Sequence, residues 1–184
     1  MFIFYCSPSG QDSISCVLTG DEPSGMEHDT RSVMRVVAVN TSEKKGMRKV
    51  SRPEVELKTN FGVAGDSHAD GTHRQLSLLG IEDINYMRSL GADVHPGDFA
   101  ENITTEGVEL STYPIGTRFR IGTDILLELT QIGKECHSGC EIRKLVGTCI
   151  MPKKGVFCRI LQGGVVRPGD SFAVVDQKED QKAD

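Results

Sequence analysis

Short apolar segments separated by glycine-containing turns occupy much of the C-terminal half of this 184-residue chain. Residues 118–121 and 125–129 flank the turn GTD, and this spacing predicts a β-hairpin. Residues 156–161 and 165–167 flank QGG and predict a second hairpin, with a last strand at residues 171–175. Closely spaced strands of this kind predict a compact, β-barrel-like architecture.

The remainder of the central region contributes one more clear strand and one helix. Residues 33–39, VMRVVAV, have the composition of a strand. Apolar residues at helical spacing, with acidic residues in the first turn, predict a short amphipathic helix from Ile81 that ends at Gly91. Residues 44–58 begin with a basic run that we expect to be solvated. The sequence therefore predicts a mainly β fold with a few short helices.

The two ends of the chain differ from its centre in composition. Residues 1–31 mix Ser, Gly, Asp and Pro without a sustained apolar period, which predicts a disordered tail or an added extension. Residues 177–184 are charged and predict a second disordered tail. The intervening residues 32–176 are expected to form one domain, since a chain with 38% hydrophobic residues can bury one good core.

Charge and hydropathy restrict the partners. The formal net charge of −5 at pH 7 argues against nucleic acids and anionic membranes, because both favour a strong basic excess. No apolar run approaches the ~18 residues that span a bilayer. The start, MFIFYC, lacks the basic and long apolar regions of a secretory signal. We therefore expect a cytoplasmic protein with a small-molecule ligand.

Four of the six cysteines fall within residues 130–158, TQIGKECHSGCEIRKLVGTCIMPKKGVFC. A cysteine acts as a nucleophile or a soft-metal ligand only as the thiolate, and neighbouring cations such as Lys134 favour that form. Gly133 loosens the backbone after an apolar strand and before Cys136, which therefore lies on a loop, where chemistry is often found. Cys136 is the first candidate for a catalytic residue and for a metal ligand.

The other cysteines of this stretch leave alternatives open. Cys158 lies in an apolar segment and is predicted to be core, Cys140 is predicted to be packing, and Cys149 is equally compatible with a resolving thiol, a ligand or packing. A zinc site would use Cys136, His137, Cys140 and Cys149. Only Cys136 and Cys140 form a closely spaced pair, so the spacing argues against zinc.

A glycine-rich loop, FGVAGDSHADGTHRQLSLLG, forms a second polar cluster that presents Asp66, His68, His73 and Arg74. Such a loop can hold an anion through backbone N–H groups and a guanidinium, although no phosphate-loop or dinucleotide fingerprint is present. The alternative is a turn with locally satisfied histidines. A hydrolase with Cys136 as nucleophile and His73 as base is also compatible with the residues, but the sequence supplies no third group to orient the base.

Four motifs, in order, resemble those of MOSC domains: GDFAENITTEG at residues 97–107, YPIGTRFRIG at 113–122, LELTQIGKEC at 127–136 and GGVVRPGD at 163–170. This family is named for the C-terminal domain of molybdenum cofactor sulfurases. The resemblance covers about residues 34–175 and is to the small stand-alone bacterial members. It implies that residues 32–176 are a MOSC domain with a β-rich, barrel-like fold.

The resemblance also implies a cofactor. One cysteine, here Cys136, would carry sulfur as a persulfide or ligate the molybdenum of a bound pterin, the molybdenum cofactor (molybdopterin), with no role for pyridoxal phosphate. The acidic-Asn element of the family maps to Glu101 and Asn102, which would shape the pocket around the cysteine. Ala100 stands where the family usually has glycine.

A pterin phosphate would give the cationic residues a role, with Arg74 as the preferred anchor beside His68, His73 and Lys134. The chain would then be a molybdenum-cofactor-binding or sulfur-carrier domain, with a cysteine desulfurase or a molybdoenzyme as candidate protein partner. The resemblance leaves three roles open. These are a sulfur transferase, a component of a molybdenum-cofactor-dependent reductase, and a non-catalytic module that holds or delivers the cofactor.

Overall fold

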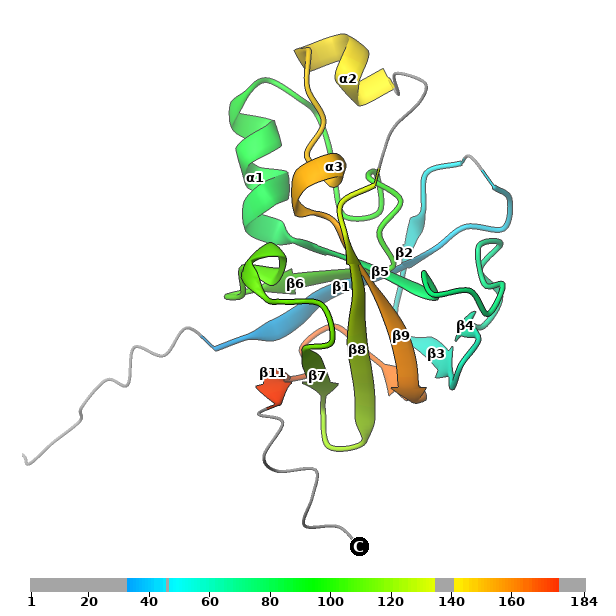
Figure 1. Cartoon of the computed structure of the whole chain (residues 1–184). Helices are drawn as coiled ribbons and strands as arrows, with labels where there is room; N and C mark the ends of the chain where they lie inside the picture. Colours follow the sequence, from blue (N-terminus) through cyan, green and yellow to red (C-terminus); the bar gives the residue numbers. More distant parts are fainter. Residues whose placement is uncertain (1–32, 46, 135–140, 176–184) are drawn as a thin grey trace, which may run out of the picture. The chain divides into compact units, whose positions relative to one another are not determined.

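The structure, a computed structural model shown in Figure 1, describes residues 33–45, 47–134 and 141–175. Short helices gather at one end of a large sheet (Figure 1). The elements in chain order are β1 (Arg35–Thr41), β2 (Val50–Arg52), β3 (Val55–Lys58), β4 (Gly62–Val63), β5 (Leu76–Gly80), α1 (Ile81–Ser89), β6 (Ile103–Glu106), the 3-10 helix η1 (Leu110–Thr112), β7 (Arg118–Ile121), β8 (Ile125–Ile132), α2 (Glu141–Val146), α3 (Met151–Lys154), β9 (Val156–Gln162), β10 (Gly164–Val166) and β11 (Phe172–Val175).

The strands of the described residues form two sheets. The larger has eight strands in the order β11-β7-β8-β9-β5-β6-β1-β2, and the smaller has the order β10-β3-β4. The β5–β6 pair is parallel and the other pairs are antiparallel. A single bridge between Arg35 and Ser171 brings β1 close to the start of β11, but the large sheet does not close into a barrel. The predicted mainly β fold is confirmed, and the barrel is open.

The two predicted hairpins have different outcomes. β7 and β8 pair with Ile121 opposite Ile125, as predicted. The second hairpin is wrong, because β9 pairs with β8 and β5 whereas β10 pairs with β3 in the smaller sheet. The reason is a close approach of two backbones at Gly163. A Cβ atom there would lie 2.2 Å from the carbonyl oxygen of Leu57, so glycine lets the chain pass from one sheet to the other.

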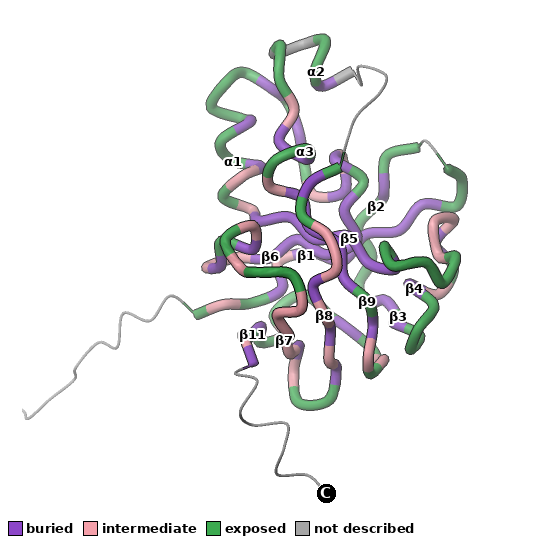
Figure 2. The backbone as a smooth tube through the Cα atoms, viewed as in Figure 1, coloured by how far each residue is buried: buried purple, intermediate pink, exposed green. Residues whose placement is uncertain are grey.

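Every residue of β5 is buried (Figure 2). Its side chains alternate between two cores, one on each face of the strand. Leu76 and Leu78 belong to the main core, and Leu79 belongs to a second core under the helices. Ile84 and Met87 of α1 are buried in that second core, which confirms the predicted amphipathic helix. The face of β5 that carries Leu79 also carries Ser77, which lines the site described below.

The predicted tails, residues 1–31 and 177–184, lie outside the described residues, so the division of the chain into tails and a central domain stays a prediction. Within the described part, no helix has the length and apolar character needed to cross a membrane.

Candidate functional site

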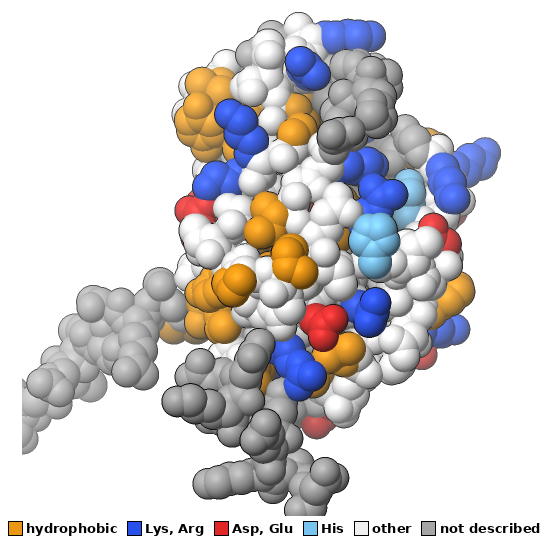
Figure 3. Space-filling view, viewed as in Figure 1, with side chains coloured by type: hydrophobic (Ala, Val, Ile, Leu, Met, Phe, Trp, Pro, Cys, Tyr) orange, Lys and Arg blue, Asp and Glu red, His pale blue; other side chains and the backbone are white. Residues whose placement is uncertain are grey.

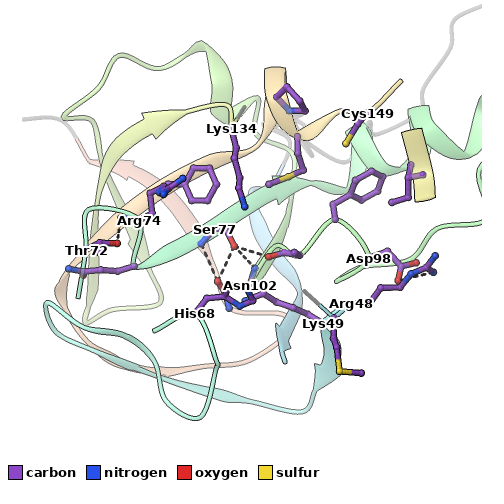
Figure 4. Close-up of a pocket in the computed structure, with 18 of the residues that line it drawn as sticks. Arg48, Lys49, His68, Thr72, Arg74, Ser77, Asp98, Asn102, Lys134 and Cys149 are labelled. Carbon is purple, nitrogen blue, oxygen red and sulfur yellow. Dashed lines mark hydrogen bonds and ion pairs between the residues drawn. The ribbon is translucent and has the colours of Figure 1, made fainter. Parts of the chain in front are cut away.

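A cavity of about 850 Å³ opens where the helices meet the loop before β5. Its walls come from segments far apart in sequence, namely the residues before β2, the loop before β5, the turn before β6, the end of β8, and α2 to β9 (Figure 4). The lining residues that carry a formal or potential charge are Arg48, Lys49, His68, Asp70, His73, Arg74, Asp98, Lys134 and Lys144. Cationic side chains therefore outnumber acidic ones on the walls.

The register between β5 and β9 sets one side of the cavity. Ser77 lies opposite Phe157 in this antiparallel pair, so both side chains project from the same face, and both line the cavity. The guanidinium of Arg74 lies over the Phe157 ring, 5.9 Å from its centroid. A cation is attracted to the face of an aromatic ring at this distance, so Phe157 orients a side chain that is otherwise exposed.

Lys49, which lines the cavity, belongs to a buried ion pair. Lys49 Nζ is 2.7 Å from Asp66 Oδ2, and the two side chains are 1% and 2% exposed. Lys49 belongs to the run at residues 44–58 that the sequence predicted to be solvated, and for this residue the prediction is wrong. Burial lowers the pKa of Lys49, although the bond to Asp66 opposes the shift.

Asp66 has more partners than Lys49. Its carboxylate also accepts hydrogen bonds from the backbone N–H groups of Ser42 and His68, each at 2.9 Å, and from the Asn102 amide at 3.4 Å. Burial by itself raises the pKa of Asp66, but the bond from Lys49 and those from the Ser42 and His68 N–H groups outweigh it, and the pKa lies below the ordinary value. Asp66 is therefore held as the carboxylate.

Asn102 lines the cavity, but its polar atoms are engaged within the protein. Its Oδ1 accepts from the backbone N–H and the hydroxyl of Ser77, at 3.2 and 2.9 Å, and its Nδ2 donates to the Asn40 carbonyl at 3.2 Å and to Asp66. The amide thus links β5 to the end of β1 and to Asp66. This geometry makes Asn102 a residue that shapes the cavity wall.

Glu101 is fully buried and does not line the cavity. Its Oε1 accepts from the backbone N–H of Gly97 at 2.5 Å and from the Thr104 hydroxyl at 3.0 Å, while Oε2 is buried without a hydrogen-bond partner in the described part of the chain. Burial raises the pKa of Glu101 to about 7. The carboxyl holds the turn at residues 97–100, three residues of which, from 98 to 100, lie on the cavity wall.

Ala100, on that turn, has a left-handed backbone with φ of 65°. An L-residue pays a steric penalty in this region that glycine does not. The backbone at Ala100 is therefore strained. This agrees with the family resemblance, in which glycine usually occupies this position.

Lys134 reaches the cavity because the end of β8 is fixed just before it. Gly133 has φ of 73°, and its N–H donates to the Gly155 carbonyl at 2.7 Å. A Cβ atom at Gly133 would lie 2.2 Å from the carbonyl oxygen of Pro152, so only glycine allows this approach to α3. The prediction that Gly133 loosens the backbone is thus wrong, because Gly133 packs tightly against the backbone of α3.

The two histidines of the loop before β5 are both on the cavity wall. His68 Nδ1 lies 3.3 Å from Asp66 Oδ1, and His73 Nε2 lies 3.0 Å from Gln131 Oε1. In the surface view, histidine and Lys or Arg side chains gather on the same part of the visible face (Figure 3). Among the labelled residues, Arg74 and Arg48 mark opposite ends of the cavity, with Lys134 between them (Figure 4).

Of the four cysteines in residues 130–158, the structure describes Cys149 and Cys158. Cys136, His137 and Cys140 lie outside the described residues, so the roles predicted for them stay predictions. Cys149 is half-buried and lines the cavity. Cys158 is fully buried in the main core, as predicted, and burial raises the pKa of its thiol. Within residues 33–45, 47–134 and 141–175, no group of three or more His, Cys, Asp or Glu side chains is placed to hold a metal ion.

Comparison with known proteins decides the family. The family model of the MOSC domain matches residues 65–173, more than half of the chain and all of the predicted site. The chain belongs to the MOSC domain family. No curated protein matches it.

Solved structures share the MOSC fold. YuaD from Bacillus subtilis has a TM-score of 0.63 at 17% identity, covering 77% of this chain and 95% of that one. YiiM from Geobacillus stearothermophilus has a TM-score of 0.59 at 20% identity, covering 78% and 76%, and YiiM from Escherichia coli has 0.52 at 21% identity, covering 80% and 70%. At these identities the likeness concerns the fold alone.

Sequence reasoning located His68, His73, Arg74, Asn102 and Lys134, all of which line one cavity. It did not find the roles of Lys49, Ser77 and Cys149. Lys49 lies in a run of basic residues, and nothing in that run distinguishes a buried lysine from a solvated one. Ser77 had a usable signal, because it is a polar residue inside the otherwise apolar strand β5.

Proposed function

We propose that this MOSC domain binds the molybdenum cofactor in the cavity, with the pterin phosphate at the Arg74 end. The observation that carries the proposal is the guanidinium of Arg74 held over Phe157 on the wall of a predominantly cationic cavity. A guanidinium matches the geometry of a phosphate and binds it through two parallel hydrogen bonds. Lys134 lines the same cavity and would add a donor to the anion. His73 also lines it and would donate from Nδ1 as the imidazolium, because its Nε2 faces Gln131.

The cavity also has a surface for the pterin rings. Its larger apolar lining residues are Met47, Phe99, Ile142, Met151, Pro152 and Phe157. A volume of about 850 Å³ lies within the range of small-molecule sites, which pair apolar walls with a few placed polar groups. The residues therefore fit a flat, phosphorylated heterocycle.

Cys136 is proposed as the soft ligand of the site. It follows Lys134, which lines the cavity, by two residues in the sequence. Its thiolate would ligate molybdenum or carry sulfur, and the bound cofactor would supply the redox chemistry of the metal. As a carrier, Cys136 would take one sulfur atom from the persulfide of a cysteine desulfurase, which is left with its own thiolate.

Replacing Arg74 with alanine is expected to weaken retention of the cofactor while leaving the fold intact. The lost contact is a charge-assisted hydrogen bond worth roughly 1.5 to 3 kcal/mol, so retention should fall roughly 10- to 150-fold. Protein purified from a host that makes the cofactor would be analysed for molybdenum and for pterin fluorescence after oxidative release. Arg159→Ala is the matched control, since Arg159 is an exposed arginine on β9 outside the cavity. Equal losses in both variants, or no loss in Arg74→Ala, would contradict the proposed anchor.

Cys136→Ser is expected to abolish persulfide labelling of the protein by a cysteine desulfurase and cysteine. One thiol should dominate because thiolate character and exposure set reactivity. Cys158 serves as an internal negative, since it is fully buried and its pKa is raised. Mass spectrometry that finds the added sulfur spread equally over Cys140, Cys149 and Cys158 would show that there is no single carrier thiol.

A further inference from the structure

The contact between His68 and Asp66 is not explained by anion binding. His68 Nδ1 lies 3.3 Å from Asp66 Oδ1, and the backbone N–H of His68 donates to the same oxygen at 2.9 Å. Asp66 is almost fully buried, whereas the His68 ring is 40% exposed and lines the cavity. A buried carboxylate therefore stands behind an imidazole that faces the ligand space.

This geometry selects one tautomer of His68. An ionised carboxylate can only accept hydrogen bonds, so the nitrogen that faces it must carry a hydrogen. Asp66 is ionised because Lys49, the Ser42 N–H and the Asn102 amide all donate to its other oxygen. The Ser67 hydroxyl also lies 3.3 Å from Nδ1, and it can accept from the same hydrogen. His68 thus carries its hydrogen on Nδ1. In the neutral ring, Nε2 then has a free lone pair, and no described residue forms a hydrogen bond with it.

The charges around the ring keep it neutral. Burial lowers the pKa of His68 below the ordinary histidine value, and the positive charges of Lys49 and Lys134 lower it further, whereas Asp66 opposes them. A neutral imidazole with Nε2 unprotonated has no hydrogen to offer an anion at that nitrogen. It accepts hydrogen bonds and protons instead.

We propose that Asp66 and His68 form a proton-accepting site on the cavity wall, in which Asp66 fixes the tautomer and His68 Nε2 accepts from an N–H or O–H group of the bound molecule. If the ligand loses that proton, it passes to Nε2, the ring becomes an imidazolium, and its charge lies against the Asp66 carboxylate. The chemical class of ligand group at this position is an uncharged hydrogen-bond donor. Asp66 is the positioning residue of the pair.

The proposal rests on the proposed function only in taking the cavity as the ligand site, and its test needs no cofactor. His73 provides a control within the same loop. Gln131 Nε2 donates to the Gly133 carbonyl at 2.7 Å, so Gln131 Oε1 is the atom that faces His73 and must accept from it. His73 should therefore carry its hydrogen on Nε2, opposite to His68.

The tautomers can be read by long-range proton–nitrogen NMR of the full chain labelled with 15N-histidine, with His68→Gln and His73→Gln used for assignment. At a pH where both rings are neutral, His68 should show a protonated Nδ1 and an unprotonated Nε2, and His73 the reverse. The titration midpoint of His68 should lie below the ordinary histidine value. A protonated Nε2 on neutral His68, or a doubly protonated ring at pH 7, would overturn the proposal.

Titration with inorganic phosphate separates this role from anion binding. If His68 is an acceptor, saturating phosphate should leave its Nε2 unprotonated at pH 7. Conversion of His68 to the imidazolium by phosphate would show that it is an anion ligand and would refute the proposed acceptor. Neither result depends on whether Arg74 retains a pterin, so failure of the cofactor assignment and failure of this proposal are distinguishable.

Discussion

Asp66→Asn is expected to destabilise the domain by about 3 to 5 kcal/mol at pH 7, because it leaves the buried Lys49 ammonium without an opposite charge. In a domain of this size that loss lowers the melting temperature by about 6 to 20 °C. Asparagine keeps the shape of Asp66 and one acceptor oxygen, but its NH2 group would face N–H donors on either side. The measured loss therefore combines the missing charge with the lost hydrogen bonds. The measurement is chemical and thermal denaturation at neutral pH.

Lys49→Met is the matched partner variant and should cost less. The Asp66 carboxylate would still accept hydrogen bonds from Ser42, His68 and Asn102. The Lys49 ammonium, in contrast, donates to Asp66 in the described part of the chain and loses its opposite charge in Asp66→Asn. The remaining cost should be about 1 to 3 kcal/mol, that of weakened bonds to a charged group. An Asp66→Asn loss below about 1 kcal/mol, or a larger loss in Lys49→Met, would mean that the pair is not the main source of stability under the cavity.

Glu101→Gln is expected to stabilise the protein at pH 8 and to leave it almost unchanged at pH 4. The pKa of Glu101 is raised from 4.5 to about 7 by burial, so the folded protein keeps this proton in a range where the unfolded chain has lost it. The contribution of Glu101 to stability is therefore fully present below pH 4.5 and decreases as the pH rises towards 7. Above pH 7 the free energy of unfolding is lower by about 3 kcal/mol than at low pH, because each unit of difference between the folded and unfolded pKa contributes about 1.4 kcal/mol.

Urea denaturation of both proteins between pH 4 and pH 8 would test this dependence. The difference between Glu101→Gln and the parent chain should be small at pH 4, grow from about pH 5 and level off near pH 8. Thr104→Val is a useful companion, because it removes the hydroxyl that donates to Oε1 without changing the carboxyl. A difference that does not vary with pH would show that Glu101 titrates near its ordinary value in the folded protein.

Polar residues in the two loops were predictable from the sequence because their chemistry is local. Arg74 and His73 stand in a glycine-rich loop before an apolar strand, and Asn102 stands in a motif that resembles the MOSC family. All three line the cavity. Their side-chain roles were not predictable. The Asn102 amide is hydrogen-bonded within the protein. The orientation of Arg74 and His73 depends on Phe157 and Gln131, which are far away in sequence.

By itself the sequence determined the mainly β class, the α1 helix, the β7–β8 hairpin and the family, because each depends on side-chain period, turn residues or motif order within a short stretch. Only the tertiary structure decided that Lys49 is buried, that Glu101 lies beneath the cavity, and that β10 leaves β9 to pair with β3. Lys49 pairs with a carboxylate 17 residues away, and Gly163 packs against the distant backbone of Leu57. Glu101 has local hydrogen-bond partners in Gly97 and Thr104, so for this residue it is the burial that only the tertiary structure decides. The sequence around Lys49, Glu101 or Gly163 has no local pattern that specifies what will pack against these residues in the fold. For the lysine and the glutamate, that packing sets the pKa of the side chain.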